Sequence, residues 1–174
     1  TPLGHAATAA ADQFPTFSMD MVTGLIPGSI AETSVIAILI GAAILLITGI
    51  ASWKIMLSVF VGGAFMGLVF NTVGPDTAMA HMPWYEHLAL GGFCFGAVFM
   101  ATDPVTSSRT ETGKYIFGFL IGVMAIVIRV LNPGYPEGMM LAILLMNIFA
   151  PLIDYYVVQS NITRRTKRTV KSNN

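Results

Sequence analysis

The chain is organised around a short stretch in which a long apolar run meets an acid: Phe99-Met100-Ala101-Thr102-Asp103-Pro104-Val105-Thr106. The apolar run begins at Trp84 and continues to Ala101. A proline disfavours helical geometry in the residue before it, so Asp103 is predicted to end or break that helix. A carboxylate at such a place needs a partner, water or a cation, or else it stays protonated.

Thr102 and Thr106 place hydroxyl oxygens on either side of Asp103, and Pro104 frees one backbone carbonyl from its helical partner. A compact set of oxygens at a helix break suits a hard cation or the polar edge of a bound cofactor. A helix cap with a solvated aspartate explains the same residues, so both interpretations stay open.

The composition is that of a membrane protein. Of the 174 residues, 55% are hydrophobic and 10% are charged, and the mean hydropathy is +0.73. A soluble domain usually carries about a quarter charged residues. The formal net charge of zero gives no indication of nucleic-acid binding, and the single Cys94 excludes a disulfide framework or a cysteine metal site. The sequence has no signal-peptide pattern and opens on Thr1, so we expect a processed chain or the second part of a longer one.

Five apolar stretches are candidates for crossing a bilayer, which takes about 20 helical residues. They cover residues 34–50, 55–73, 84–101, 115–131 and 139–158. We therefore predict an all-α integral membrane protein. It has an outward-facing polar segment at residues 1–33, a five-helix transmembrane domain at residues 34–158 and a basic tail at residues 159–174.

Basic residues gather on one side of this five-span arrangement. They are Lys54, Arg109, Lys114, and Arg164, Arg165, Lys167, Arg168 and Lys171 of the tail. By the positive-inside rule that side is cytoplasmic, so the C-terminal tail is predicted to lie in the cytoplasm. The segments 1–33, 71–83 and 132–138 then face outward.

Two further sets of charged residues lie within or beside the spans. Asp154 lies inside the last span, and an intramembrane acid is a functional candidate by default. An ion pair with Arg164 or Arg165 is the alternative explanation for it. Arg129 and Glu137 flank a turn rich in proline and glycine. Either a simple ion pair closes this turn, or both residues lie near a bound anionic or polar ligand.

The three histidines, His5, His81 and His87, show no metal-ligand spacing and are predicted to lie at the surface or the membrane interface. No phosphate loop, nucleotide fingerprint or nucleophile elbow is present. Any redox or transport chemistry must therefore come from a cofactor or an ion pathway. Two glycine-rich segments, 62–70 and 91–99, are similar to each other, and helix-packing faces are the simpler interpretation of both.

Several motifs, spread over nearly the whole chain, together resemble one family of membrane subunits. They are residues 25–30, 32–34, 99–106, 118–122, 128–144 and 147–154. This NqrB/RnfD family contains a membrane subunit of the bacterial sodium-translocating NADH:quinone oxidoreductase and, as a near relative, a membrane subunit of the Rnf ferredoxin complex. The turn at 132–138 and the Arg-rich tail are more similar to the former.

The resemblance implies a ten-helix fold built from two five-helix halves, of which this chain would be the second. It implies FMN held by a phosphoester bond to a threonine, and the start Thr1-Pro2-Leu3-Gly4 fits the end of the family's attachment motif. It further implies riboflavin, electron transfer to quinone, Na⁺ translocation, and a multi-subunit complex in the bilayer of the bacterial inner membrane.

Site residues follow from the same resemblance. Thr1 would carry the covalent FMN, and Arg129, Tyr135 and Glu137 are candidate contacts for a cofactor. Acids in the helices of the family are implicated in sodium passage. The candidates for this path are Asp103 and Asp154, together with Thr102 and Thr106.

Three alternatives to this function remain open. One is a subunit of the Rnf type, with ferredoxin and NAD as end partners. Another is half of a channel or secondary transporter, because broken helices also suit a substrate pathway. The last is a membrane scaffold without a cofactor. A measurement of flavin content would distinguish the sodium-pump and Rnf subunits, which carry flavin, from a transporter half or a scaffold, which do not.

Overall fold

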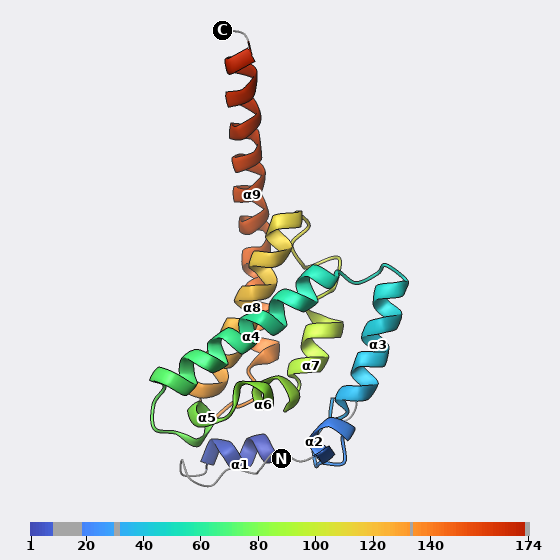
Figure 1. The fold of residues 1–174 in the computed structure, drawn as a ribbon, viewed down its shortest axis with the longest axis vertical. Helices are drawn as coiled ribbons and strands as arrows, with labels where there is room; N and C mark the ends of the chain where they lie inside the picture. Colours follow the sequence, from blue (N-terminus) through green and yellow to red (C-terminus); the bar gives the residue numbers. More distant parts are fainter. Residues whose placement is uncertain (9–18, 30–31, 133, 173–174) are drawn as a thin grey trace.

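The computed structural model describes residues 1–8, 19–29, 32–132 and 134–172 (Figure 1). These residues form helices and connections, and no strand occurs among them. The elements in chain order are α1 (Pro2–Thr8), α2 (Met19–Thr23), α3 (Val35–Ile47), α4 (Trp53–Val73), α5 (Ala78–His81), α6 (Trp84–Ala89), α7 (Phe93–Phe95), the π-helical turn η1 (Gly96–Met100), α8 (Glu111–Leu131) and α9 (Met139–Ser172).

Within the described ranges, three helices are long and apolar enough to cross a membrane, namely α4, α8 and α9. They confirm the helices predicted at residues 55–73, 115–131 and 139–158. The stretch predicted at residues 34–50 is helical only over the 13 residues of α3, which is short for a full crossing. The helix stops because the chain turns at Gly49, whose φ of +70° is left-handed.

The prediction of one continuous helix over residues 84–101 is wrong. The α6 helix ends at Ala89, and Gly91 adopts a φ of +65°, which only glycine takes without strain. The chain becomes helical again at Phe93 and continues through η1 to Met100. Two adjacent glycines, Gly91 and Gly92, therefore divide the run into a first part that contains Glu86 and His87 and a second part that is apolar throughout.

The α9 helix is longer than predicted, because it continues through Pro151 and through the basic tail to Ser172. Its C-terminal half extends beyond the other helices (Figure 1). The tail predicted at residues 159–174 is thus a helical continuation of the last span over the residues that the structure describes.

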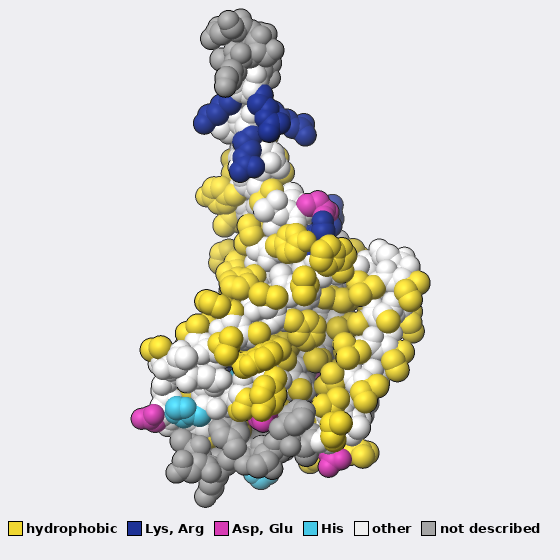
Figure 2. Space-filling model, in the orientation of Figure 1, with side chains coloured by type: hydrophobic (Ala, Val, Ile, Leu, Met, Phe, Trp, Pro, Cys, Tyr) yellow, Lys and Arg dark blue, Asp and Glu magenta, His cyan; other side chains and the backbone are white. Residues whose placement is uncertain are grey.

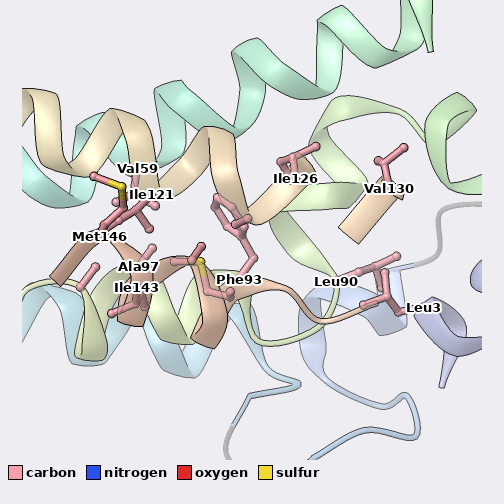
Figure 3. Packing of buried hydrophobic residues seen from close by; sticks show 14 of the residues in the cluster. Leu3, Val59, Leu90, Phe93, Ala97, Ile121, Ile126, Val130, Ile143 and Met146 are labelled. Carbon is pink, nitrogen blue, oxygen red and sulfur yellow. The ribbon is translucent and has the colours of Figure 1, made fainter. Parts of the chain in front are cut away.

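Glycines allow α4 and α8 to pack closely. A Cβ atom at Gly62 would overlap the carbonyl of Phe119, and one at Gly122 would overlap the carbonyl of Val59. This confirms the packing interpretation for the first glycine-rich segment. Apolar side chains fill the space between α4, α7, α8 and α9, and Leu3 of α1 lies beside Leu90 at the end of α6 (Figure 3).

The surface is divided into bands (Figure 2). Lys and Arg side chains gather at the end that carries the C-terminal part of α9, where an acidic side chain also lies beside a basic one. Hydrophobic side chains cover the middle, and histidines and further acids lie at the opposite end. Large apolar residues are exposed on α3, α4 and α9, such as Ile40, Leu57 and Ile148. Such a wide apolar band is expected of a protein that contacts lipid rather than water.

Candidate functional site

The break between α6 and α7 is stabilised by a buried arginine from α8. The Arg129 side chain is 0% exposed, and its guanidinium donates four hydrogen bonds. The acceptors are the carbonyls of His87 at 2.6 Å, Leu90 at 3.3 Å, Pro136 at 3.1 Å and Glu137 at 3.4 Å. The planar guanidinium thus joins the end of α6 to the turn before α9.

The carboxylate of Glu137 holds the other side of the break, because it accepts a hydrogen bond of 2.9 Å from the backbone N–H of Gly92. A cation therefore meets the carbonyl end of α6, and an anion meets the amide end of α7. Both contacts satisfy backbone groups that a helix leaves unpaired at its ends. The simple ion pair predicted between Arg129 and Glu137 is wrong, since each side chain binds backbone groups at the break.

His87 is also placed differently from its prediction. His5 and His81 are exposed, but His87 is 0% exposed, and the neighbouring Glu86 is 3% exposed. The short α6 helix packs against α4, and His87 lies on its protein-facing side, whereas Trp84 and Tyr85 of the same helix are exposed. His87 is buried because the chain breaks after α6 and this short helix packs against α4. A prediction of one continuous span therefore could not show that His87 is buried.

Thr1 lies at a cavity beside the same break. The narrow cavity of about 20 Å³ is lined by Thr1, Glu32, Gly91 and Glu137, with apolar residues of α1 and of the connection before α3. The Thr1 side chain is exposed, and its hydroxyl oxygen accepts a hydrogen bond of 3.0 Å from the N–H of Gly4. Two residues predicted to serve the cofactor, Thr1 and Glu137, are therefore brought together.

The cavity has room for about one water molecule and cannot enclose a flavin ring. Its two carboxylates, Glu32 and Glu137, disfavour a phosphate inside it, because like charges in a site of low dielectric repel. The exposed hydroxyl of Thr1 nevertheless fits a phosphoester that points outward, since an ester oxygen still accepts the Gly4 N–H. The residues fit an attachment point at Thr1, with the ring outside the cavity.

Arg129 and Tyr135, the other two residues predicted to contact a cofactor, have different neighbours in the structure. Four of the five N–H donors of Arg129 already bind backbone carbonyls. Tyr135 is 39% exposed in the turn before α9, where its N–H donates to the carbonyl of Asn132. It does not line the cavity at Thr1.

The loop that opens with Asp103 lies at the opposite, basic end of the molecule. The carboxylate of Asp103 accepts hydrogen bonds from the N–H of Val105 at 3.3 Å, the N–H of Thr106 at 3.2 Å and the hydroxyl of Thr106 at 2.8 Å. The Thr106 hydroxyl and these amides hold the pKa of Asp103 below its usual value. The hydroxyl of Thr102 is buried and donates to the carbonyl of Val98 at 2.6 Å.

Asp154 of α9 joins this loop to the start of α8. Its carboxylate accepts hydrogen bonds from the hydroxyls of Ser108 at 2.5 Å and Thr110 at 2.6 Å, and from the N–H groups of Arg109 at 2.8 Å and Thr110 at 3.1 Å. Arg164 and Arg165 lie ten and eleven residues further along the same helix, so their Cα atoms are about 15 Å or more from that of Asp154 along the helix axis. The predicted pairing of Asp154 with these arginines is therefore wrong.

The two candidate sodium acids have separate sets of partners, Asp103 with Val105 and Thr106 and Asp154 with residues 108–110. In the part of the chain that the structure describes, no three His, Cys, Asp or Glu side chains gather as metal ligands. Ser108 and Thr110 were missed by sequence reasoning, because they reach Asp154 from 44 to 46 residues away. The Gly91-Gly92 pair was a visible signal for the break.

Comparison with known proteins identifies the family. The family model described as the NQR2, RnfD, RnfE family matches residues 1–163. The chain is also similar to proteins that are named as a subunit of the Na(+)-translocating NADH-quinone reductase. It is 63% identical over 150 residues to the protein of Chromohalobacter salexigens, covering 86% of this chain and 36% of that protein.

The similarity extends to other bacteria. The identity is 59% over 153 residues for Azotobacter vinelandii, covering 87% of this chain and 38% of that protein. The identity to the protein of Klebsiella pneumoniae is 55% over 166 residues, covering 95% of this chain and 40% of that protein. The chain therefore spans less than half the length of these curated relatives. Because the family model covers nearly all of it, the chain belongs to the NQR2, RnfD, RnfE family.

Proposed function

We propose that this chain is the C-terminal part of the NqrB-type membrane subunit of a sodium-translocating NADH:quinone oxidoreductase. The observation that carries the proposal is the identity of 55–63% to subunits with that name over most of the chain. The complex would pass electrons from NADH to quinone and move Na⁺ across the membrane, with the other subunits of the relatives' complex as partners.

Within this function, Thr1 carries FMN as a phosphoester, and riboflavin is a second flavin of the same subunit. Flavin supplies the one- and two-electron redox chemistry that side chains lack. Thr1 supports the proposal because its hydroxyl is exposed and lies against the fixed break between α6 and α7. Arg129 and Glu137 fix the position of that break, and the acids of the cavity keep a phosphate on its outer side.

The proposed membrane arrangement keeps five crossings. The α4, α8 and α9 helices cross in full, while α3 and the composite of α6, α7 and η1 supply the other two. This half would join a first half of five helices to complete a ten-helix fold. The end rich in Lys and Arg, with the C-terminus, faces the cytoplasm, because basic residues are retained on that side.

For sodium, Asp103 is the better of the two candidate acids. Its three hydrogen bonds come from an exposed local turn, whereas the four hydrogen bonds of Asp154 join α9 to the loop before α8. The hydroxyl of Thr106 could ligate a cation if its proton turned away from Asp103, because its lone pairs would then face the ion.

The test is NADH-driven quinone reduction by the purified complex that contains the full-length subunit. We expect the rate to rise with Na⁺ concentration and reduced ferredoxin to be a poor donor. Quinone reduction that is independent of Na⁺ would contradict the sodium assignment. Activity with ferredoxin and NAD, without quinone, would instead indicate the Rnf type of complex.

A further inference from the structure

A polar pocket at the basic end of the molecule lies beside the loop of Asp103, and Thr102 and Pro104 of that loop are part of its lining. It has a volume of about 430 Å³ and lies between the connection from α3 to α4, the loop after η1 and the first turn of α8. The residues that carry its chemistry are Ser52, Trp53, Lys54, Arg109, Glu111 and Lys114. Pockets of this size hold small ligands or head groups.

The charges of the pocket wall favour an anion. Lys54 and Lys114 both form ion pairs with the same carboxylate, that of Glu111, and their side chains are 25% and 23% exposed. Arg109 is exposed, and its guanidinium forms no ion pair within the described part of the chain. The side chains that line the pocket carry three positive charges and one negative charge, so the lining attracts a phosphate. The carboxylates of Asp154 and Asp103 lie next to this lining, and both already accept hydrogen bonds from the loop.

An apolar groove lies directly beneath this pocket on the same two helices. It also has a volume of about 430 Å³, and its lining is Leu57, Ser58, Val61, Tyr115, Ile116, Phe119 and Leu120. Lys54 shares one face of α4 with the groove residues of that helix, since they follow it by three, four and seven positions. The pocket and the groove therefore follow one another along the two helices, with Lys54 one turn before Leu57 on α4 and Lys114 next to Tyr115 on α8.

Aromatic rings mark the level at which pocket and groove meet. The Trp53 and Tyr115 rings pack edge to face with centroids 6.3 Å apart, and the Nζ of Lys54 lies 5.8 Å from the Tyr115 ring centre. Both rings are half-exposed. Tryptophan and tyrosine prefer the boundary between lipid head groups and acyl chains, so this level is where a head group would lie.

We propose that the pocket and the groove together bind an anionic phospholipid. Its phosphate lies among Lys54, Arg109 and Lys114, and one acyl chain follows the groove between α4 and α8. Basic pockets between membrane helices are known binding places for anionic head groups. A soluble phosphate would use the cations but leave the apolar groove unused, and a neutral lipid would leave the cations unused.

The experiment uses the purified complex with the full-length subunit, washed free of bound lipid in detergent. Dioleoyl phosphatidylglycerol is added back, and the lipid retained on the complex is measured by native mass spectrometry over a range of lipid concentrations. Dioleoyl phosphatidylcholine, with the same chains and no net charge, is the neutral probe. Inorganic phosphate is added as a competitor in a separate series.

Arg109→Gln is the principal variant, because Lys54 also links α4 to α8 through Glu111, and Lys114 pairs with the same carboxylate. A basic residue at an anionic membrane surface contributes about fivefold to affinity. We expect Arg109→Gln to weaken retention of one phosphatidylglycerol by about fivefold. Glu111→Gln should strengthen it by about fivefold, because it removes the competing carboxylate, and a purely structural role of Glu111 would not produce that gain.

The matched control is Lys167→Gln with Arg168→Gln, which removes two charges from the same end of the molecule but outside the pocket. This control should retain phosphatidylglycerol as the wild type does. Equal loss in the control, unchanged retention in Arg109→Gln, or equal retention of phosphatidylcholine would each overturn the proposal. Displacement of the lipid by inorganic phosphate would also overturn it, by indicating a site for the free ion.

Discussion

At the scale of single residues, the acids at the basic end differ in what their oxygens do. Asp154 accepts four hydrogen bonds from residues 108–110, and Asp103 accepts three from the two residues after Pro104. The first set holds together segments that are distant in sequence. The second set closes a local turn, so the two carboxylates should respond differently to neutralisation.

Asp154→Asn should destabilise the protein by about 2 kcal/mol. The amide keeps one acceptor but places an NH₂ group against hydroxyls and N–H groups that need acceptors. The measurement is the thermal unfolding of the purified complex. Asp76→Asn is the control, because the Asp76 side chain is fully exposed at the other end. Equal stability of Asp154→Asn and the wild type would show that the loop does not depend on this carboxylate.

Asp103→Asn should leave the fold intact, because asparagine keeps one acceptor oxygen and the exposed turn lets water accept from the donors that the amide loses. If Asp103 binds the transported ion, the half-saturating Na⁺ concentration of quinone reduction should rise at normal flavin content, since a hard cation prefers a carboxylate. An unchanged Na⁺ dependence would make Asp103 a structural residue.

The pKa of Asp103 gives this site a defined pH dependence. Because the folded pKa lies below the ordinary value of 3.8, the charged turn contributes stability above that value. This contribution is lost as the pH falls through the lowered folded pKa. Thr106→Val removes the hydroxyl that most lowers the pKa, so in that variant the contribution should be smaller and its loss should be complete at a higher pH.

At the scale of elements, the arrangement depends on the break between α6 and α7. Arg129→Lys should lower the free energy of unfolding by about 3 kcal/mol, because an ammonium cannot reach four carbonyls in the plane of a guanidinium. Glu137→Gln should cost about 1 kcal/mol, since the amide oxygen still accepts the Gly92 N–H. Unfolding of the complex, with Lys167→Gln as the control, checks both values.

A smaller effect of Arg129→Lys than of Glu137→Gln would contradict the assigned contacts. Proteolysis gives a second measurement, because loss of the contacts should expose the chain near Gly91. The wild type and the Lys167→Gln control should stay resistant there.

The elements also show what a sequence can and cannot predict. The α4, α8 and α9 helices were predictable, because each is a long apolar run with few charges. The break at Gly91 was missed, because residues 84–101 were treated as one span although Glu86, His87 and the glycine pair interrupt its apolar character. The partners of Arg129 could not be predicted either, since they come from two segments that only the fold brings together. The candidate site at Thr1 was indicated by resemblance, but its contact with the break was not.

At the scale of the whole molecule, the bands of charge predict the orientation in the membrane. A cysteine placed at Lys167 should react with an impermeant reagent only from the cytoplasmic side, and one placed at Asp76 only from the outside. The native Cys94 is buried and should react slowly. The full-length subunit is used, with its other cysteines replaced. Labelling of both positions from one side would mean that the number of crossings between them is even.

The central proposal is that Thr1, beside the break, carries the flavin. The most direct measurement is mass spectrometry of the peptide that contains Thr1, taken from the denatured full-length subunit of the native complex. We predict a mass increase equal to FMN less one water on Thr1, together with flavin fluorescence of the denatured band. Thr1→Ala should abolish both. An unmodified Thr1 peptide in an active complex, or fluorescence that persists in Thr1→Ala, would contradict the proposal.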